Sequence, residues 1–168
     1  MRKFFVFATL IAIFSAPAFA ALTATLGSTP GREGVGGPFE VTIGTDAEPG
    51  PTWADYGVTS GFYTFCVEPD NATLALGQPF GATINNDVRF GGSNAPVKDL
   101  TKQIYAAYLN AGSPTGHTGA IFQDAIWDAE AGQNSSSAIN QVLDGSEDTA
   151  GWEGVKALNL WAGTGDNR

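Results

Sequence analysis

The sequence predicts an α+β fold, with an antiparallel sheet or sandwich-like body first and a helical subdomain in the C-terminal half. Two observations lead to this prediction. Residues 21–67 alternate or cluster β-forming side chains between Gly- and Pro-rich breakers, which is typical of short strands. After Pro96 the apolar residues recur at helical spacing instead. No internal repeat or low-complexity linker divides the chain, so residues 21–168 are expected to form a single domain.

The strands expected in this body lie at residues 21–26, 39–44, 61–67, 80–84 and 87–91. The runs GSTPGREGVGGP and DAEPGPTWADYG separate the first three of them. The last two are joined around Asn85-Asn86-Asp87, a combination that favours a turn. The first half of the chain therefore reads as antiparallel sheet.

The first expected helix follows Pro96. Its apolar positions are Val97, Leu100, Ile104, Tyr108 and Ala111. The run Gly112-Ser113-Pro114 ends it, because glycine and proline disfavour a continuing helix.

A Gly-rich loop, GSPTGHTG, then leads into a second helix at about residues 119–131, with Thr118 as its N-cap. Its core positions are expected to be Phe122, Ala125, Ile126 and Ala129. Two more helical segments are expected at residues 135–143 and 150–163.

Residues 1–20 have the pattern of a secretory signal peptide. A short basic start, an apolar run too short to span a bilayer and Ala18-x-Ala20 before Ala21 follow one another. The mature chain is therefore expected to be exported, to the extracellular space or the cell surface, with no membrane insertion. Its polar C-terminal end leaves open whether the domain is truncated there.

The charge balance of the expected mature chain is strongly acidic. Without Arg2 and Lys3, six basic residues face seventeen acidic ones, a net charge of −11. Nucleic acids and anionic membranes bind clustered lysine and arginine, so neither is an expected partner. No cofactor is indicated by the sequence.

Hydrolytic and metal chemistry find little support. The single histidine, His117, lies in the Gly-rich loop and no G-x-S-x-G elbow is present, so a Cys66–His117 dyad lacks a local signature. No metal site is expected. The run from Asp144 resembles a calcium loop, but it has Thr149 where the turn needs glycine and Val155 where a glutamate is needed.

The single cysteine of the chain is the most informative residue, because exported proteins usually hold structural cysteines in even numbers. Cys66 stands in Phe65-Cys66-Val67, on an expected strand. Gln123 stands near the start of the second helix, in the run FQDAIW. These two motifs, in this order, resemble those of bacterial thioester domains, the terminal modules of surface adhesins.

The resemblance implies that the sulfur of Cys66 displaces ammonia from the side chain of Gln123 and forms an internal thioester. Such a bond acylates an amine-bearing surface or matrix macromolecule in a single event, without enzymatic turnover. Similar domains occur in exported Gram-negative proteins with a Pro-Glu-Pro sorting tail, and this sequence contains no such tail. The resemblance covers residues 60–131 best.

The residues themselves support this chemistry. The unpaired N–H groups at the start of the second helix are expected to stabilise the oxyanion that forms when sulfur attacks the amide. Only the folded chain can bring the two motifs together, so the reaction would be intramolecular. Phe65, Phe122 and Trp127 are expected to surround the bond and to slow its hydrolysis.

Other interpretations stay open, among them an intermolecular disulfide through Cys66. Cys66 could be a buried core residue and Gln123 an ordinary surface residue of a helix. The chain could also be a non-covalent matrix- or carbohydrate-binding β-domain, in which Trp53 and Tyr56 form a stacking platform in a loop. The remaining tryptophans lie in helix-like segments, where aromatic residues are more often core.

Overall fold

The computed structural model describes residues 22–28, 37–47, 50–67, 75–90, 93–145 and 147–161. The expected signal peptide lies outside these residues. The elements, in chain order, are β1 (Leu22–Ser28), β2 (Phe39–Ile43), the 3-10 helix η1 (Trp53–Tyr56), β3 (Phe62–Thr64), β4 (Pro79–Asn85), β5 (Asp87–Phe90), β6 (Ser93–Pro96), α1 (Asp99–Asn110), α2 (Gly116–Glu130), α3 (Ser137–Val142), the 3-10 helix η2 (Trp152–Gly154) and β7 (Ala157–Trp161). The predicted α+β fold is confirmed.

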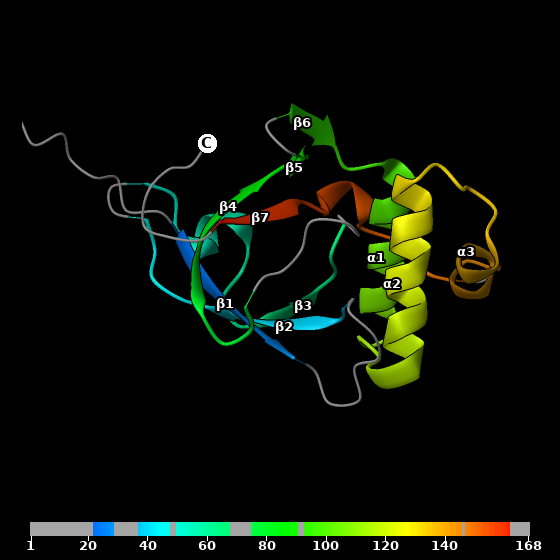
Figure 1. Cartoon of the computed structure of the whole chain (residues 1–168), viewed down its shortest axis with the longest axis horizontal. Helices are drawn as coiled ribbons and strands as arrows, with labels where there is room; N and C mark the ends of the chain where they lie inside the picture. Colours follow the sequence, from blue (N-terminus) through cyan, green and yellow to red (C-terminus); the bar gives the residue numbers. More distant parts are fainter. Residues whose placement is uncertain are drawn as a thin grey trace, which may run out of the picture.

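Five strands form a curled antiparallel sheet in the order β3-β2-β1-β4-β7 (Figure 1). The buried side of β1 consists of Leu22, Ala24 and Leu26, with half-buried residues between them. This alternation arises because successive side chains of a strand point to opposite faces of the sheet. Val41 and Trp53 belong to the same apolar cluster, which forms the core of the sheet.

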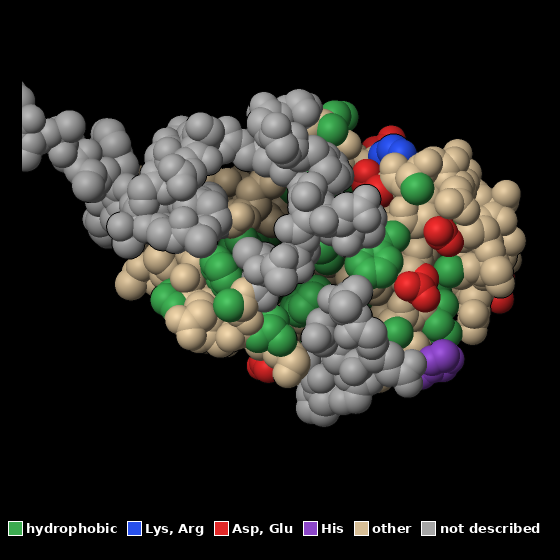
Figure 2. Space-filling model, in the orientation of Figure 1, with side chains coloured by type: hydrophobic (Ala, Val, Ile, Leu, Met, Phe, Trp, Pro, Cys, Tyr) green, Lys and Arg blue, Asp and Glu red, His purple; other side chains and the backbone are tan. Residues whose placement is uncertain are grey.

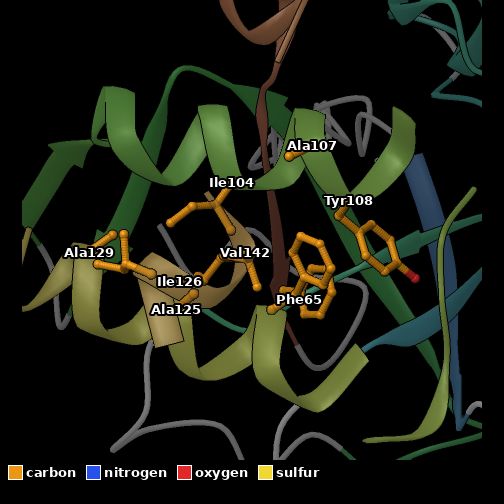
Figure 3. Close-up of a cluster of buried hydrophobic side chains, with 10 residues drawn as sticks. Phe65, Ile104, Ala107, Tyr108, Ala125, Ile126, Ala129 and Val142 are labelled. Carbon is orange, nitrogen blue, oxygen red and sulfur yellow. The ribbon is translucent and has the colours of Figure 1, made fainter. Parts of the chain in front are cut away.

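The helices pack beside one end of the sheet, with α1 and α2 next to each other (Figure 1). Their shared core contains Ile104 and Tyr108 of α1 and Ile126 of α2. Figure 3 shows these side chains between the two helices, together with Phe65 from the loop after β3. The predicted core positions of α2, including Phe122 and Ala129, are all buried, as the helical spacing indicated.

The prediction of a helix at residues 150–163 is wrong. This segment forms η2 and then β7, which returns to the sheet and pairs with β4. Leu158 and Leu160 pack against the sheet core, whereas Ala157 belongs to a separate cluster with Val88. The period of β7 is therefore two, and five residues are too few for the sequence to distinguish a strand from a helix.

Two predicted boundaries also need correction. The second helix begins at Gly116 with Thr115 as its N-cap, so His117 and Thr118 lie in its first turn and not in a loop. Close packing explains why a glycine stands at position 119 inside the helix, because a Cβ there would lie 2.6 Å from Cδ of Pro38. The expected strand at 61–67 ends at Thr64, which leaves Cys66 outside it.

None of the helices in the described part of the chain combines the length and the apolar character needed to cross a membrane.

Candidate functional site

The candidate site forms where the β2–β3 ladder ends. The last pair of this antiparallel ladder is Phe39 with Thr64. Two residues before Phe39 and two residues after Thr64, the same register places Gly37 opposite Cys66. The ladder does not continue to this pair, and a side chain from α2 occupies the position where strand pairing would continue.

That side chain is Gln123. Its Oε1 accepts hydrogen bonds from the main-chain N–H of Gly37 at 2.7 Å and from that of Cys66 at 3.0 Å. Its Nε2 donates to the main-chain carbonyl of Cys66 at 2.6 Å. We call these two N–H groups and this carbonyl the carboxamide cradle. The cradle joins three segments, since Gln123 lies 86 residues from Gly37 and 57 residues from Cys66.

The N–H groups that hold the carbonyl oxygen of Gln123 are not those expected from the sequence. Gln123 is the eighth residue of α2, two turns from its first N–H groups, and its carbonyl oxygen is held by the loops before β2 and after β3. The unpaired N–H groups of the helix start therefore do not supply the donors. Gly37 is not among the residues predicted from the sequence, because a Gly-Pro pair indicates only a break between strands. A usable signal was present, since Gly37 stands two residues before a strand.

Gly37 has no room for a side chain. A Cβ at this position would lie 3.0 Å from both Cδ1 of Phe65 and the carbonyl oxygen of Thr64, and 3.1 Å from Oε1 of Gln123. These distances are tighter than nine in ten real Cβ contacts, so a side chain would force its neighbours to move by a few tenths of an ångström. Glycine at this position lets the main chain approach the carboxamide closely enough to donate.

The buried side of the site is aromatic. Phe65, the neighbour of Cys66, packs edge-on against Tyr108 with ring centroids 4.6 Å apart, and Tyr108 packs against Phe122 at 5.3 Å. Figure 3 shows Phe65 and Tyr108 side by side in this core. Burial raises the pKa of Tyr108 to about 12 and the pKa of Tyr105 above its ordinary range, so both phenols stay neutral at physiological pH.

The two reactive candidates differ in exposure. Gln123 is only 2% exposed, whereas Cys66 is half-buried. Phe65 and Phe122 lie in the helical core as expected, and Trp127, one turn beyond Gln123, is half-buried. Figure 2 shows hydrophobic side chains reaching the surface where sheet and helices meet, with acidic side chains over α2. Water is thus excluded from the amide more than from the cysteine.

This geometry places the amide of Gln123 against the main chain of Cys66, the residue that carries the sulfur. The amide carbon of Gln123 lies between Oε1 and Nε2, which pair with the N–H and the carbonyl of Cys66. This carbon therefore faces the Cα of Cys66. The sulfur is two bonds from that Cα. Two N–H donors at 2.7 and 3.0 Å already hold the oxygen that would become negative, which is the geometry of an oxyanion hole.

The alternative binding platform is contradicted in part. Trp53 is 3% exposed and belongs to the sheet core, so it cannot present its indole face to a sugar ring. It lies in η1, whose start is fixed by a capping box between Thr52 and Asp55. Tyr56, at 37% exposure, is the only member of the predicted pair on the surface.

Two further sequence predictions can be placed in the structure. His117 is exposed in the first turn of α2, six residues before Gln123. Within the described ranges, the structure shows no group of three or more His, Cys, Asp or Glu side chains that could hold a metal ion.

Comparisons with protein-family models, with curated proteins and with solved structures find no match.

Proposed function

We propose that this chain is an exported binding domain in which Cys66 and Gln123 form an internal thioester that acylates an amine-bearing surface or matrix partner. The observation that carries the proposal is the seating of the Gln123 carboxamide against both the N–H and the carbonyl of Cys66, with a second N–H from Gly37 on its oxygen. The buried amide of Gln123 is thus held beside the one cysteine of the chain.

The first step forms the thioester. The sulfur of Cys66 attacks the amide carbon, and the N–H groups of Gly37 and Cys66 stabilise the negative oxygen of the tetrahedral intermediate. The carbon–nitrogen bond then breaks, and Nε2 leaves as ammonia with the proton of the thiol. Because all groups belong to one folded chain, the reaction needs no other protein.

The second step attaches the target. A primary amine attacks the thioester carbon, the carbon–sulfur bond breaks and the thiol of Cys66 takes up a proton. The product is an amide between Gln123 and the target. Each molecule reacts once, so the domain acts as a reactive binding module and not as an enzyme with turnover.

The experiment is incubation with a fluorescent primary alkylamine. Wild type is expected to carry the label at Gln123, located by peptide mass spectrometry, and to keep it under thiol reduction because the new bond is an amide. Cys66→Ala is the matched control, since the hydrogen bonds of Cys66 to Gln123 come from its main chain and survive the substitution. Equal labelling of wild type and Cys66→Ala would refute the proposal.

A further inference from the structure

The nitrogen of Gln123 is held by a hydrogen bond whose direction restricts the amides that can occupy the cradle. Nε2 donates to the same residue, Cys66, whose N–H is bonded to Oε1. Such a paired arrangement uses the amide hydrogen that lies on the same side of the C–N bond as the oxygen. In an ordinary trans amide with a substituent on nitrogen, that position belongs to the substituent.

We infer that the Cys66 carbonyl makes attachment to a target one-way, an inference that rests on the proposed thioester. An unsubstituted carboxamide fits the cradle and is open to attack by sulfur. A substituted trans amide does not fit, because its first carbon would occupy the space of a hydrogen that bridges a distance of only 2.6 Å. The attached product therefore leaves the cradle and is no longer held for attack.

The size of the effect follows from the cis–trans preference of amides. A substituted amide can return to the cradle only in its cis form, which keeps an N–H beside the oxygen. The cis form of a secondary amide is populated on the order of 100-fold less than the trans form. Reversal from an attached amine is therefore expected to be about 100-fold slower than reversal from ammonia.

The forward reaction does not suffer the same restriction. In the tetrahedral intermediate the carbon–nitrogen bond is single, so the substituent can rotate away from the Cys66 carbonyl. The amine can then attack while the oxygen stays on the N–H groups of Gly37 and Cys66. The cradle thus separates the two directions: it accepts the amide that forms the thioester and rejects the amide that results from its use.

The test compares three adducts of the same folded, full-length protein. Portions of the thioester form are opened with ammonia, with methylamine or with trifluoroethylamine, and the amine is removed by desalting. Intact mass under denaturing conditions and a thiol-reactive probe then follow re-formation of the thioester. Trifluoroethylamine is a weaker base than ammonia and so a better leaving group, which separates leaving ability from fit in the cradle.

The ammonia adduct is expected to lose ammonia and its titratable thiol again, while both substituted adducts revert about 100-fold more slowly or not at all. Reversion of the methylamine adduct at the rate of the ammonia adduct would overturn the inference. So would an ammonia adduct that does not revert, or fastest reversion from trifluoroethylamine. A starting protein that has its full calculated mass and takes up no amine would instead overturn the proposed function itself, and the first mass measurement shows which case applies.

Discussion

Gly37 and Cys66 lie opposite each other just past the last paired residues of β2 and β3, and both donate their main-chain N–H to the same oxygen of Gln123. A strand ladder brings such groups together at fixed spacing, and the ladder stops where the inserted carboxamide takes its hydrogen bonds. The sheet therefore determines the positions of these two N–H donors, and α2 supplies the amide that they hold.

Gly37→Ala is expected to slow thioester formation by roughly 100-fold, the loss typical of one oxyanion donor. The added Cβ would collide with Phe65, Thr64 and Oε1 of Gln123, so the N–H must move away from the oxygen. The rate is read as loss of ammonia from the protein mass after refolding. Gly27→Ala is the matched control, since a Cβ there meets only ordinary contacts at 3.7 Å or more. Wild-type rates in both variants would exclude Gly37 as a donor.

Gln123→Ala is expected to lower the free energy of unfolding by about 2–4 kcal/mol, because two main-chain N–H groups lose their acceptor. The comparison belongs in a Cys66→Ala background, where no thioester can form. Urea unfolding of Cys66→Ala and of the double variant measures the difference. A change below about 0.5 kcal/mol would mean that these hydrogen bonds are replaced by water at little cost.

Opening the thioester is expected to destabilise the fold. A bond between residues 57 apart restricts the unfolded chain, and by the chain-entropy argument used for disulfides it contributes about 4 kcal/mol. The intact protein and the methylamine-opened protein have the same sequence apart from the adduct. Because the adduct also leaves the cradle, the difference in unfolding free energy, measured by denaturant unfolding, is expected to be at least about 4 kcal/mol. Identical midpoints would be inconsistent with a cross-link between these positions.

Alkaline pH is expected to weaken the aromatic side of the site. The pKa of Tyr108 is raised by burial to about 12 from about 10 in the unfolded chain, so its contribution is fully present below pH 10 and is lost as the pH rises toward 12. In a Cys66→Ala background, Tyr108→Phe should therefore show a shallower fall in unfolding free energy over this range. Tyr105, with its pKa also raised by burial, contributes to the slope that remains. Equal slopes with and without the Tyr108 hydroxyl would contradict this assignment.

Much of the fold could be predicted from periodicity, because burial follows it. The alternation of Leu22, Ala24 and Leu26 indicated a strand, and the spacing of Phe122, Ala125 and Ala129 indicated the buried face of α2. The segment at β7 was wrongly predicted as a helix, since Leu158 and Leu160 face the sheet only because β4 is there to pair with them. Tertiary pairing, not local preference, decides such short segments.

The site was predictable in part. Cys66 and Gln123 could be paired from their motifs, but the donors were assigned to the wrong place because the position of Gln123 along α2 depends on where the helix begins. Gly116 and Gly119 were expected to lie before the helix or at its very start, and the packing of Gly119 against Pro38 cannot be read from the sequence. Trp53 was expected on the surface for a similar reason, since the burial of a short 3-10 helix depends on the sheet beneath it.

The internal thioester is tested most directly by the intact mass of freshly folded protein, measured under denaturing conditions together with reaction of a thiol-specific probe. A thioester between Cys66 and Gln123 predicts a mass one ammonia below that calculated for the same chain, and no titratable thiol. Cys66→Ala and Gln123→Ala should each have the full mass of their own sequence. A correctly folded wild type with its full calculated mass, glutamine still at position 123 and one titratable thiol would contradict the internal thioester.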